Sequence, residues 1–65
     1  MEHLNAVELY ELGYSLGYQH PFMDEHYVTE HPNIAKYVTN NVNHYWFSYG
    51  YSDGQVKKSA ELRSD

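Results

Sequence analysis

The feature that most constrains this chain is a short sequence that occurs twice. Residues 10–17 and residues 47–54 each hold an aromatic residue and, three positions later, Gly-Tyr-Ser-x-Gly. The copies are offset by 37 positions, which gives the pairs Tyr10/Phe47, Gly13/Gly50, Tyr14/Tyr51, Ser15/Ser52 and Gly17/Gly54. A glycine inside a helix costs roughly 1 kcal/mol relative to alanine. Four glycines at matched spacing therefore predict that two helix backbones approach closely at these points, within one chain or between two chains.

The length of 65 residues allows one small domain. A domain of this size buries only about 60 % of the surface of its unfolded chain, so an enclosed active site of several layers does not fit. The sequence has no cysteine, and therefore no disulfide and no thiolate metal site, and no apolar stretch approaches the length of a membrane span. We expect a soluble protein of the cytoplasm, or of the host cytoplasm if a phage encodes it.

Charge is distributed unevenly along the chain. Residues 1–35 hold six acidic residues and no Lys or Arg, which gives −6, whereas residues 36–65 hold four basic and three acidic residues, which gives +1 and a net charge of −5. Binding of nucleic-acid phosphates needs clustered Lys and Arg. We therefore expect no direct binding of nucleic acid and no membrane partner, but a host protein with a basic surface as the partner.

The first predicted helix spans about residues 3–18. At 100° per residue, Glu8 and Glu11 lie on one polar stripe, with leucines on one side of the helix and tyrosines on the other. The small residues between these two sides form a groove that suits a second helix, and they are Ala6, Gly13 and Gly17. The helix should end near Gln19, because Pro21 disfavours the α conformation at the preceding residue.

The second predicted helix spans about residues 33–52 and follows a structured, Pro-containing connection of residues 19–32. Its apolar residues share one arc about 120° wide and are Ile34, Ala35, Val38, Val42, Tyr45, Trp46 and Tyr49. We expect Tyr45, Trp46 and Tyr49 in the core. The aromatic residues outside the arc should stay at least partly exposed, and they are Tyr37, Phe47 and Tyr51.

These patterns together predict an all-α fold. The expected domain, residues 1–54, is a two-helix hairpin whose helices pack through Trp46 and through Gly13, Gly17, Gly50 and Gly54. Asp53-Gly54 is a signal for the end of a helix, so residues 55–65 are predicted to form a separate charged tail.

Catalysis and metal binding have little support in the sequence. His20, His26 and His31 lie among carboxylates, but their spacings match no zinc motif, and we interpret them as polar loop residues. Glu8 and Glu11 lie on an exposed stripe, and the chain has no nucleophile elbow, Ser-x-x-Lys motif or phosphate-binding glycine loop. We predict a protein that is not an enzyme and that uses no metal and no cofactor.

The aromatic content points instead to an interaction surface. Eight tyrosines, two phenylalanines and one tryptophan are more rings than so small a core needs. Tyrosine is enriched among the residues that dominate protein interfaces. The predicted binding residues combine rings with carboxylates and are Glu8, Tyr10, Glu11, Tyr14, Asp24, Glu25, Tyr37, Phe47 and Tyr51.

The order of these motifs resembles the ribosome modulation factor family, whose outline many short phage and plasmid proteins share. The resemblance covers about residues 10–54 and is carried by Gly13-Tyr14-Ser15-Leu16-Gly17, Pro21, Trp46 and Gly50-Tyr51. It implies a two-helix fold and, for the best-known members, binding to the small ribosomal subunit during hibernation. Those members are strongly basic, as contact with ribosomal RNA requires, whereas this chain is acidic. The resemblance therefore implies the fold more directly than the ribosomal function.

Three functions are compatible with the sequence. The first is a phage or mobile-element inhibitor that occupies the basic groove of a host restriction, CRISPR or transcription protein. Its carboxylates would partly imitate DNA phosphates, and the candidates are Glu2, Glu8, Glu11, Asp24, Glu25 and Glu30. The second is a stress or hibernation factor that contacts ribosomal proteins rather than RNA. The third is a structural homodimer that pairs Gly13/Gly17 or Gly50/Gly54 across a two-fold axis.

Overall fold

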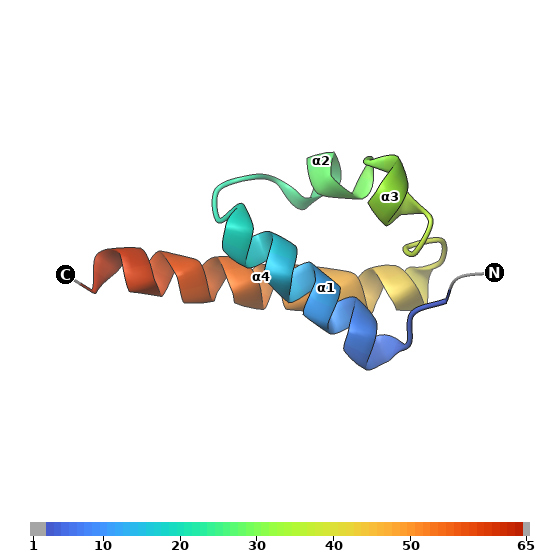
Figure 1. The fold of residues 1–65 in the computed structure, drawn as a ribbon, viewed down its shortest axis with the longest axis horizontal. Coiled ribbons are helices and arrows are strands. Elements are labelled where there is room, and N and C mark those ends of the chain that lie inside the picture. The colour runs from blue at the N-terminus through green and yellow to red at the C-terminus, as the bar shows by residue number, and fades with distance from the viewer. Residues whose placement is uncertain (1–2, 65) are drawn as a thin grey trace.

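A computed structural model describes residues 3–64, and all of its regular structure is helical (Figure 1). Two long helices, α1 (Ala6–Gln19) and α4 (Asn41–Arg63), pack against each other, and two short ones, α2 (Glu25–Thr29) and α3 (Pro32–Ala35), lie between them in the chain. The predicted all-α fold with two packed helices and a structured connection is confirmed. Glu2, a candidate phosphate mimic, lies outside the described residues.

Helix α1 begins and ends where local side chains require it. The Asn5 side chain accepts a hydrogen bond from the Glu8 backbone N–H, and the Glu8 carboxylate accepts one from the Asn5 N–H, a reciprocal capping box. This cap sets the first helical residue at Ala6, three residues later than predicted. The helix ends at Gln19, immediately before the His20-Pro21 step.

Helix α4 begins at Asn41 and not near residue 33, which corrects the prediction. The Asn40 side chain caps the helix by accepting a hydrogen bond from the Asn43 N–H, and the Asn43 amide donates to the Tyr37 carbonyl oxygen. The residues from 33 onward instead belong first to the four-residue helix α3, which ends at Ala35, and the chain bends before α4 starts. The apolar spacing continues across this break, so periodicity alone could not locate it.

Helix α4 also continues through Gly54 to Arg63, so residues 55–63 of the predicted charged tail are helical and Ser64 is the C-cap. Glycine ends helices where it adopts a positive φ angle, but none of the glycines here does so. Gly54 is instead a packing residue inside the helix. Its buried position shows that the Asp53-Gly54 signal marked a contact and not a helix end.

The four glycines form the contact between α1 and α4, as the repeat predicts. A Cβ atom added to any of them would lie 2.0–2.2 Å from a backbone carbonyl oxygen of the other helix, closer than real Cβ atoms come. The pairs are Gly13 with Phe47, Gly17 with Tyr51, Gly50 with Tyr10 and Gly54 with Tyr14. The glycine hydrogens point at these oxygens, an arrangement that permits Cα–H···O contacts worth roughly 0.5–1 kcal/mol each.

The two helices run in the same direction. Residue numbers rise together along the contact, from Gly13 beside Phe47 to Gly17 beside Tyr51, and both helices run from right to left in Figure 1. α1 and α4 are the two arms of the predicted hairpin, but residues 20–40, here called the lid, carry the chain back along the pair before α4 begins. The lid therefore makes the parallel arrangement possible.

The glycine contacts also reveal an internal pseudo-two-fold axis. Gly13 faces the carbonyl of Phe47, and the residues 37 positions from these two, Gly50 and Tyr10, face each other in the same way. The same exchange relates the Gly17–Tyr51 contact to the Gly54–Tyr14 contact. Such reciprocity is the mark of an isologous contact between equivalent surfaces. Here both surfaces belong to one chain.

The core lies on one side of this helix pair, beneath the lid. Phe47 and Tyr51 of α4 are 0 % and 2 % exposed and form a cluster with Val28 of α2, against which Leu12 and Leu16 of α1 also pack. Polar ties fix the lid in place. The Tyr51 hydroxyl donates to the Met23 carbonyl oxygen at 2.7 Å, and the Gln55 amide donates to the carbonyl oxygens of His20 and Met23.

Burial of Phe47 and Tyr51 is the reverse of the prediction, which placed them at the surface. Tyr45 and Tyr49, predicted in the core, are 60 % and 49 % exposed, and Trp46 is half-buried. Helix α4 packs on α1 through its glycines, and an apolar pattern read from side chains does not register glycine. The apolar arc predicted for α4 therefore faces away from the core. The rings next to the glycines on the lid side fill the core instead.

Substitution at the helix contact provides a direct test. We expect Gly50→Ala to lower the free energy of unfolding by about 1–3 kcal/mol, because its Cβ would meet the Tyr10 carbonyl oxygen at 2.0 Å and force the helices apart. On an unpacked helix the same change would stabilise by roughly 1 kcal/mol. The matched control is Ser52→Ala, on an exposed position of the same helix. Urea denaturation compares the variants, and an unchanged or higher stability of Gly50→Ala would contradict the contact.

Candidate protein-binding site

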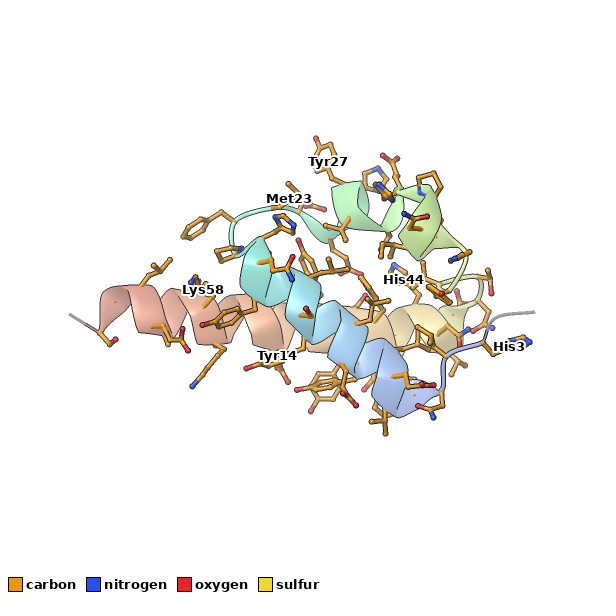
Figure 2. The ribbon with its side chains drawn as sticks, viewed as in Figure 1. His3, Tyr14, Met23, Tyr27, His44 and Lys58 are labelled. Atoms are coloured by element: carbon orange, nitrogen blue, oxygen red, sulfur yellow. The ribbon has the colours of Figure 1, made fainter. Side chains whose placement is uncertain are left out.

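A cluster of aromatic rings covers the side of the helix pair that the lid leaves uncovered. It consists of Tyr10 and Tyr14 of α1 and Tyr45, Trp46 and Tyr49 of α4, and it is here called the open face. Figure 2 shows Tyr14 on one side of the pair and Met23 and Tyr27 of the lid on the other. The open face is therefore not part of the core.

The rings of the open face touch one another in a continuous chain. Tyr10 and Tyr14 have ring centroids 6.1 Å apart, and Tyr10 meets Tyr49 across the helix contact edge-on at 5.3 Å. Tyr49 stacks on Trp46 at 6.3 Å, and Tyr45 meets Trp46 edge-on at 5.3 Å. Neighbouring rings restrict one another's rotamers, so the surface is largely pre-organised, which reduces the entropy lost when a partner binds.

Apolar exposure extends beyond the rings. Val7 and Val42 lie one helical turn before Tyr10 and Tyr45 on the same helix faces, and each is 65 % exposed. Together with the exposed area of Tyr45 and Tyr49 they form an apolar surface that spans both helices. Contiguous exposed apolar surface on a small protein commonly marks a site of interaction with another molecule.

Two carboxylates of α4 hold tyrosine hydroxyls of α1. The Tyr10 hydroxyl donates a hydrogen bond of 2.6 Å to the Asp53 carboxylate. This hydrogen bond, with desolvation and the negative charge of Asp53, raises the pKa of Tyr10 to about 12. The Tyr18 hydroxyl donates to Glu61, and this bond likewise raises the pKa of Tyr18. Lys58 lies over the Tyr18 ring, 4.9 Å from its centroid. These contacts fix the outer edge of α1 on α4.

Three of the four acidic residues predicted to bind a partner instead form contacts within the protein itself. Glu8 belongs to the capping box of α1, and Asp24 caps α2 by accepting from the His26 N–H. Glu25 accepts from the Ser48 hydroxyl and lies 3.3 Å from the His44 imidazole, which ties the lid to α4. Glu11 is the exception. It is exposed on α1, directly after Tyr10 and three residues before Tyr14, and makes no hydrogen bond or ion pair with any described residue.

The structure thus brings together only part of the predicted binding set. Tyr10, Tyr14 and Glu11 share one side of the molecule, whereas Phe47 and Tyr51 lie beneath the lid and Tyr37 lies half-buried within it. The prediction missed Tyr45 and Tyr49 as surface residues. The register of the repeat could have shown that these rings lie beside the helix contact, because it places the glycines of both helices at that contact. It does not show which side of the helix pair the lid covers.

The predicted loop histidines also have local roles. The His31 imidazole caps α3 by accepting from the Asn33 N–H, and the His26 imidazole lies 3.0 Å from the Glu30 carboxylate. Among residues 3–64 no group of three or more His, Asp or Glu side chains has the geometry to hold a metal ion. Within the same residues, no helix has the length and apolar character that a membrane crossing requires.

Two of the apolar hollows outside the open face lie along α4 and beneath the lid. One, of about 460 Å³, follows the free end of α4 and includes Phe22, Val56 and Leu62, and another, of about 340 Å³, lies between α1 and the lid and includes Leu16 and Ile34. Neither hollow is lined by a carboxylate. A third hollow, of about 700 Å³, lies on the lid and is lined by Phe22, Met23 and Tyr27 together with Asp24, which caps α2. The open face differs from these hollows in holding five rings in mutual contact across both long helices, so we place the candidate site there.

Comparison with known proteins gives no match for this chain among protein-family models, curated proteins or solved structures.

The hydrogen bond between Tyr10 and Asp53 generates a prediction about pH. Because the pKa of Tyr10 is about 12 in the folded protein and about 10 in the unfolded chain, its contribution to stability is complete below pH 10 and is lost as the pH rises towards 12. Asp53→Asn should lower the pKa of Tyr10 towards 10. Titration of ¹³Cζ-labelled tyrosine by NMR measures both values, and a wild-type Tyr10 that titrates near 10 would show that this bond is absent in solution.

Proposed function

We propose that this protein is a small interaction module that binds a partner protein through the open face. The observation that supports it best is the exposed, mutually packed ring cluster that two helices build on the uncovered side. Tyrosine and tryptophan give large contact area for little loss of side-chain entropy, and they dominate the energetics of many interfaces. No group in the described residues suggests catalysis in competition with this role.

The acidic groups beside the rings favour a basic partner surface. Glu11 and Asp53 flank the open face, and Arg and Lys side chains both pair with carboxylates and stack on aromatic rings. A host protein that handles nucleic acid presents such a surface in its binding groove. We therefore propose an inhibitor that blocks this groove, in which the rings supply most of the affinity and the carboxylates supply orientation.

Imitation of DNA phosphates has a smaller part in this proposal than the sequence suggested. Glu8, Asp24 and Glu25 are held by backbone N–H groups or by side chains of the protein itself, and Glu30 lies beside His26. Their positions follow the needs of helix caps and lid ties, not the spacing of phosphates. The homodimer hypothesis changes as well, because both glycine faces are used within the chain and a dimer would need another surface.

Affinity capture with matched tyrosine variants tests the proposal. The tagged protein, its Tyr45→Ser/Tyr49→Ser variant and a Tyr27→Ser control are applied to nuclease-treated lysate of the cells that carry it, and bound proteins are identified by mass spectrometry. Tyr27 is as exposed as Tyr45 but lies on the lid. We expect one dominant nucleic-acid-binding protein that the control retains and that the double variant binds at least about tenfold more weakly.

The other outcomes separate the alternatives. Ribosomal proteins recovered as a set would favour the ribosome-associated function. A partner that binds all three proteins equally would show that the open face is not the binding site, and recovery of the bait alone would contradict the proposed function.

A further inference from the structure

The pseudo-two-fold axis relates the open face to the face beneath the lid. A shift of 37 positions pairs the core residues Phe47 and Tyr51 with Tyr10 and Tyr14. It also pairs the buried or core-packed leucines of α1 with two rings of the open face and with Asp53 beside them, as Leu9/Trp46, Leu12/Tyr49 and Leu16/Asp53. The helix pair therefore offers two equivalent faces, and within residues 3–64 the lid covers only one of them.

The way in which the lid is held shows what a cover of such a face requires. Apolar lid residues, among them Val28 and Ile34, pack against Phe47 and Tyr51. In addition, the Tyr51 hydroxyl donates to a lid carbonyl oxygen, that of Met23. The counterpart of Tyr51 on the open face is Tyr14, whose hydroxyl has no hydrogen-bond partner among residues 3–64. Within the described residues, the Tyr14 hydroxyl is therefore a hydrogen-bond donor without an acceptor, at the position equivalent to the Tyr51 hydroxyl.

The two faces differ in charge at one pair of equivalent positions, where the covered face has Ser48 and the open face has Glu11. On the covered face the lid carboxylate Glu25 is held by Ser48 and His44. Their counterparts on α1, 37 positions earlier, are Glu11 and Val7. A segment that followed the path of the lid across the open face would therefore bring the residue equivalent to Glu25 beside the Glu11 carboxylate, where a negative charge is repelled and a positive charge is attracted.

We propose that the open face binds a short, partly helical apolar segment of a partner in the way that the covered face binds the lid, and that this segment carries a Lys or Arg that pairs with Glu11. The inference rests on the proposed function and adds the chemistry of the bound segment. Asp53, which replaces the apolar Leu16 of the covered face, adds a second carboxylate for such a segment. Tyr14 supplies the hydrogen bond to a backbone carbonyl that Tyr51 supplies to the lid.

A library of 20-residue random peptides, displayed on phage and selected on the immobilised full-length protein, tests this inference. We expect selected peptides to hold apolar residues at helical spacing and one Lys or Arg. The same peptides should bind Glu11→Lys about tenfold or more weakly, while selection on Glu11→Lys should enrich Asp or Glu instead. Glu30→Lys, the same change of charge on the exposed surface of the lid, is the control and should bind like the wild type.

The site of binding is read from NMR shifts, which should be largest for Tyr14 and Tyr49. Failure to select peptides, or peptides with no preference for basic residues or no response to Glu11→Lys, would overturn the inference. Sedimentation of the wild type as a dimer that Tyr49→Ser dissociates would overturn it as well, because a second copy would then be the occupant. If these tests fail while lysate capture still depends on Tyr45 and Tyr49, the proposed function stands and only the chemistry of the segment is wrong.

Discussion

The structure depends on the contact of two helix backbones at four glycines. Each glycine faces a carbonyl oxygen of the opposite helix so closely that no side chain fits between them. Glycine in a helix is intrinsically unfavourable by roughly 1 kcal/mol per residue, so four of them persist only where packing offsets this cost. Such small-residue contacts are best known from membrane helices, where close approach is not driven by burial of apolar surface. In this chain apolar side chains beside the contact add that driving force.

This contact determines on which side of the helix pair the neighbouring side chains lie. With no side chains at the centre, rings and leucines are displaced to the two sides of the helix pair, and the two sides are related by the pseudo-two-fold axis. The lid covers one side and makes it the core, with Phe47 and Tyr51 buried. The other side keeps Tyr10, Tyr14, Tyr45, Trp46 and Tyr49 uncovered. Within residues 3–64 no other segment covers this side, and it is therefore available to another molecule.

The sequence predicted the parts of this fold that local chemistry controls. The glycine repeat predicted the close contact, and the leucines, tyrosines and Pro21 predicted α1 to within three residues. The start of α4 was missed because the apolar spacing of Ile34 and Val38 happens to continue that of Val42 across the bend before the Asn40 cap. The core was predicted on the wrong side of α4 because apolar periodicity gives no weight to glycine.

Of the candidate site, Tyr10, Tyr14 and Glu11 could be predicted. The exposure of Tyr45 and Tyr49 could not, because it depends on which face the lid covers, and this is settled only by tertiary structure.

The measurement that tests this account most directly is the set of NOEs from the glycine Hα protons of the full-length protein. The parallel, reciprocal contact predicts cross-peaks of Gly13 with Phe47, of Gly17 with Tyr51, of Gly50 with Tyr10 and of Gly54 with Tyr14. A pattern in which Gly13 contacts Gly54 while Gly17 contacts Gly50 would mean that the helices run in opposite directions. That result would remove the pseudo-two-fold axis and, with it, the equivalence of the two faces.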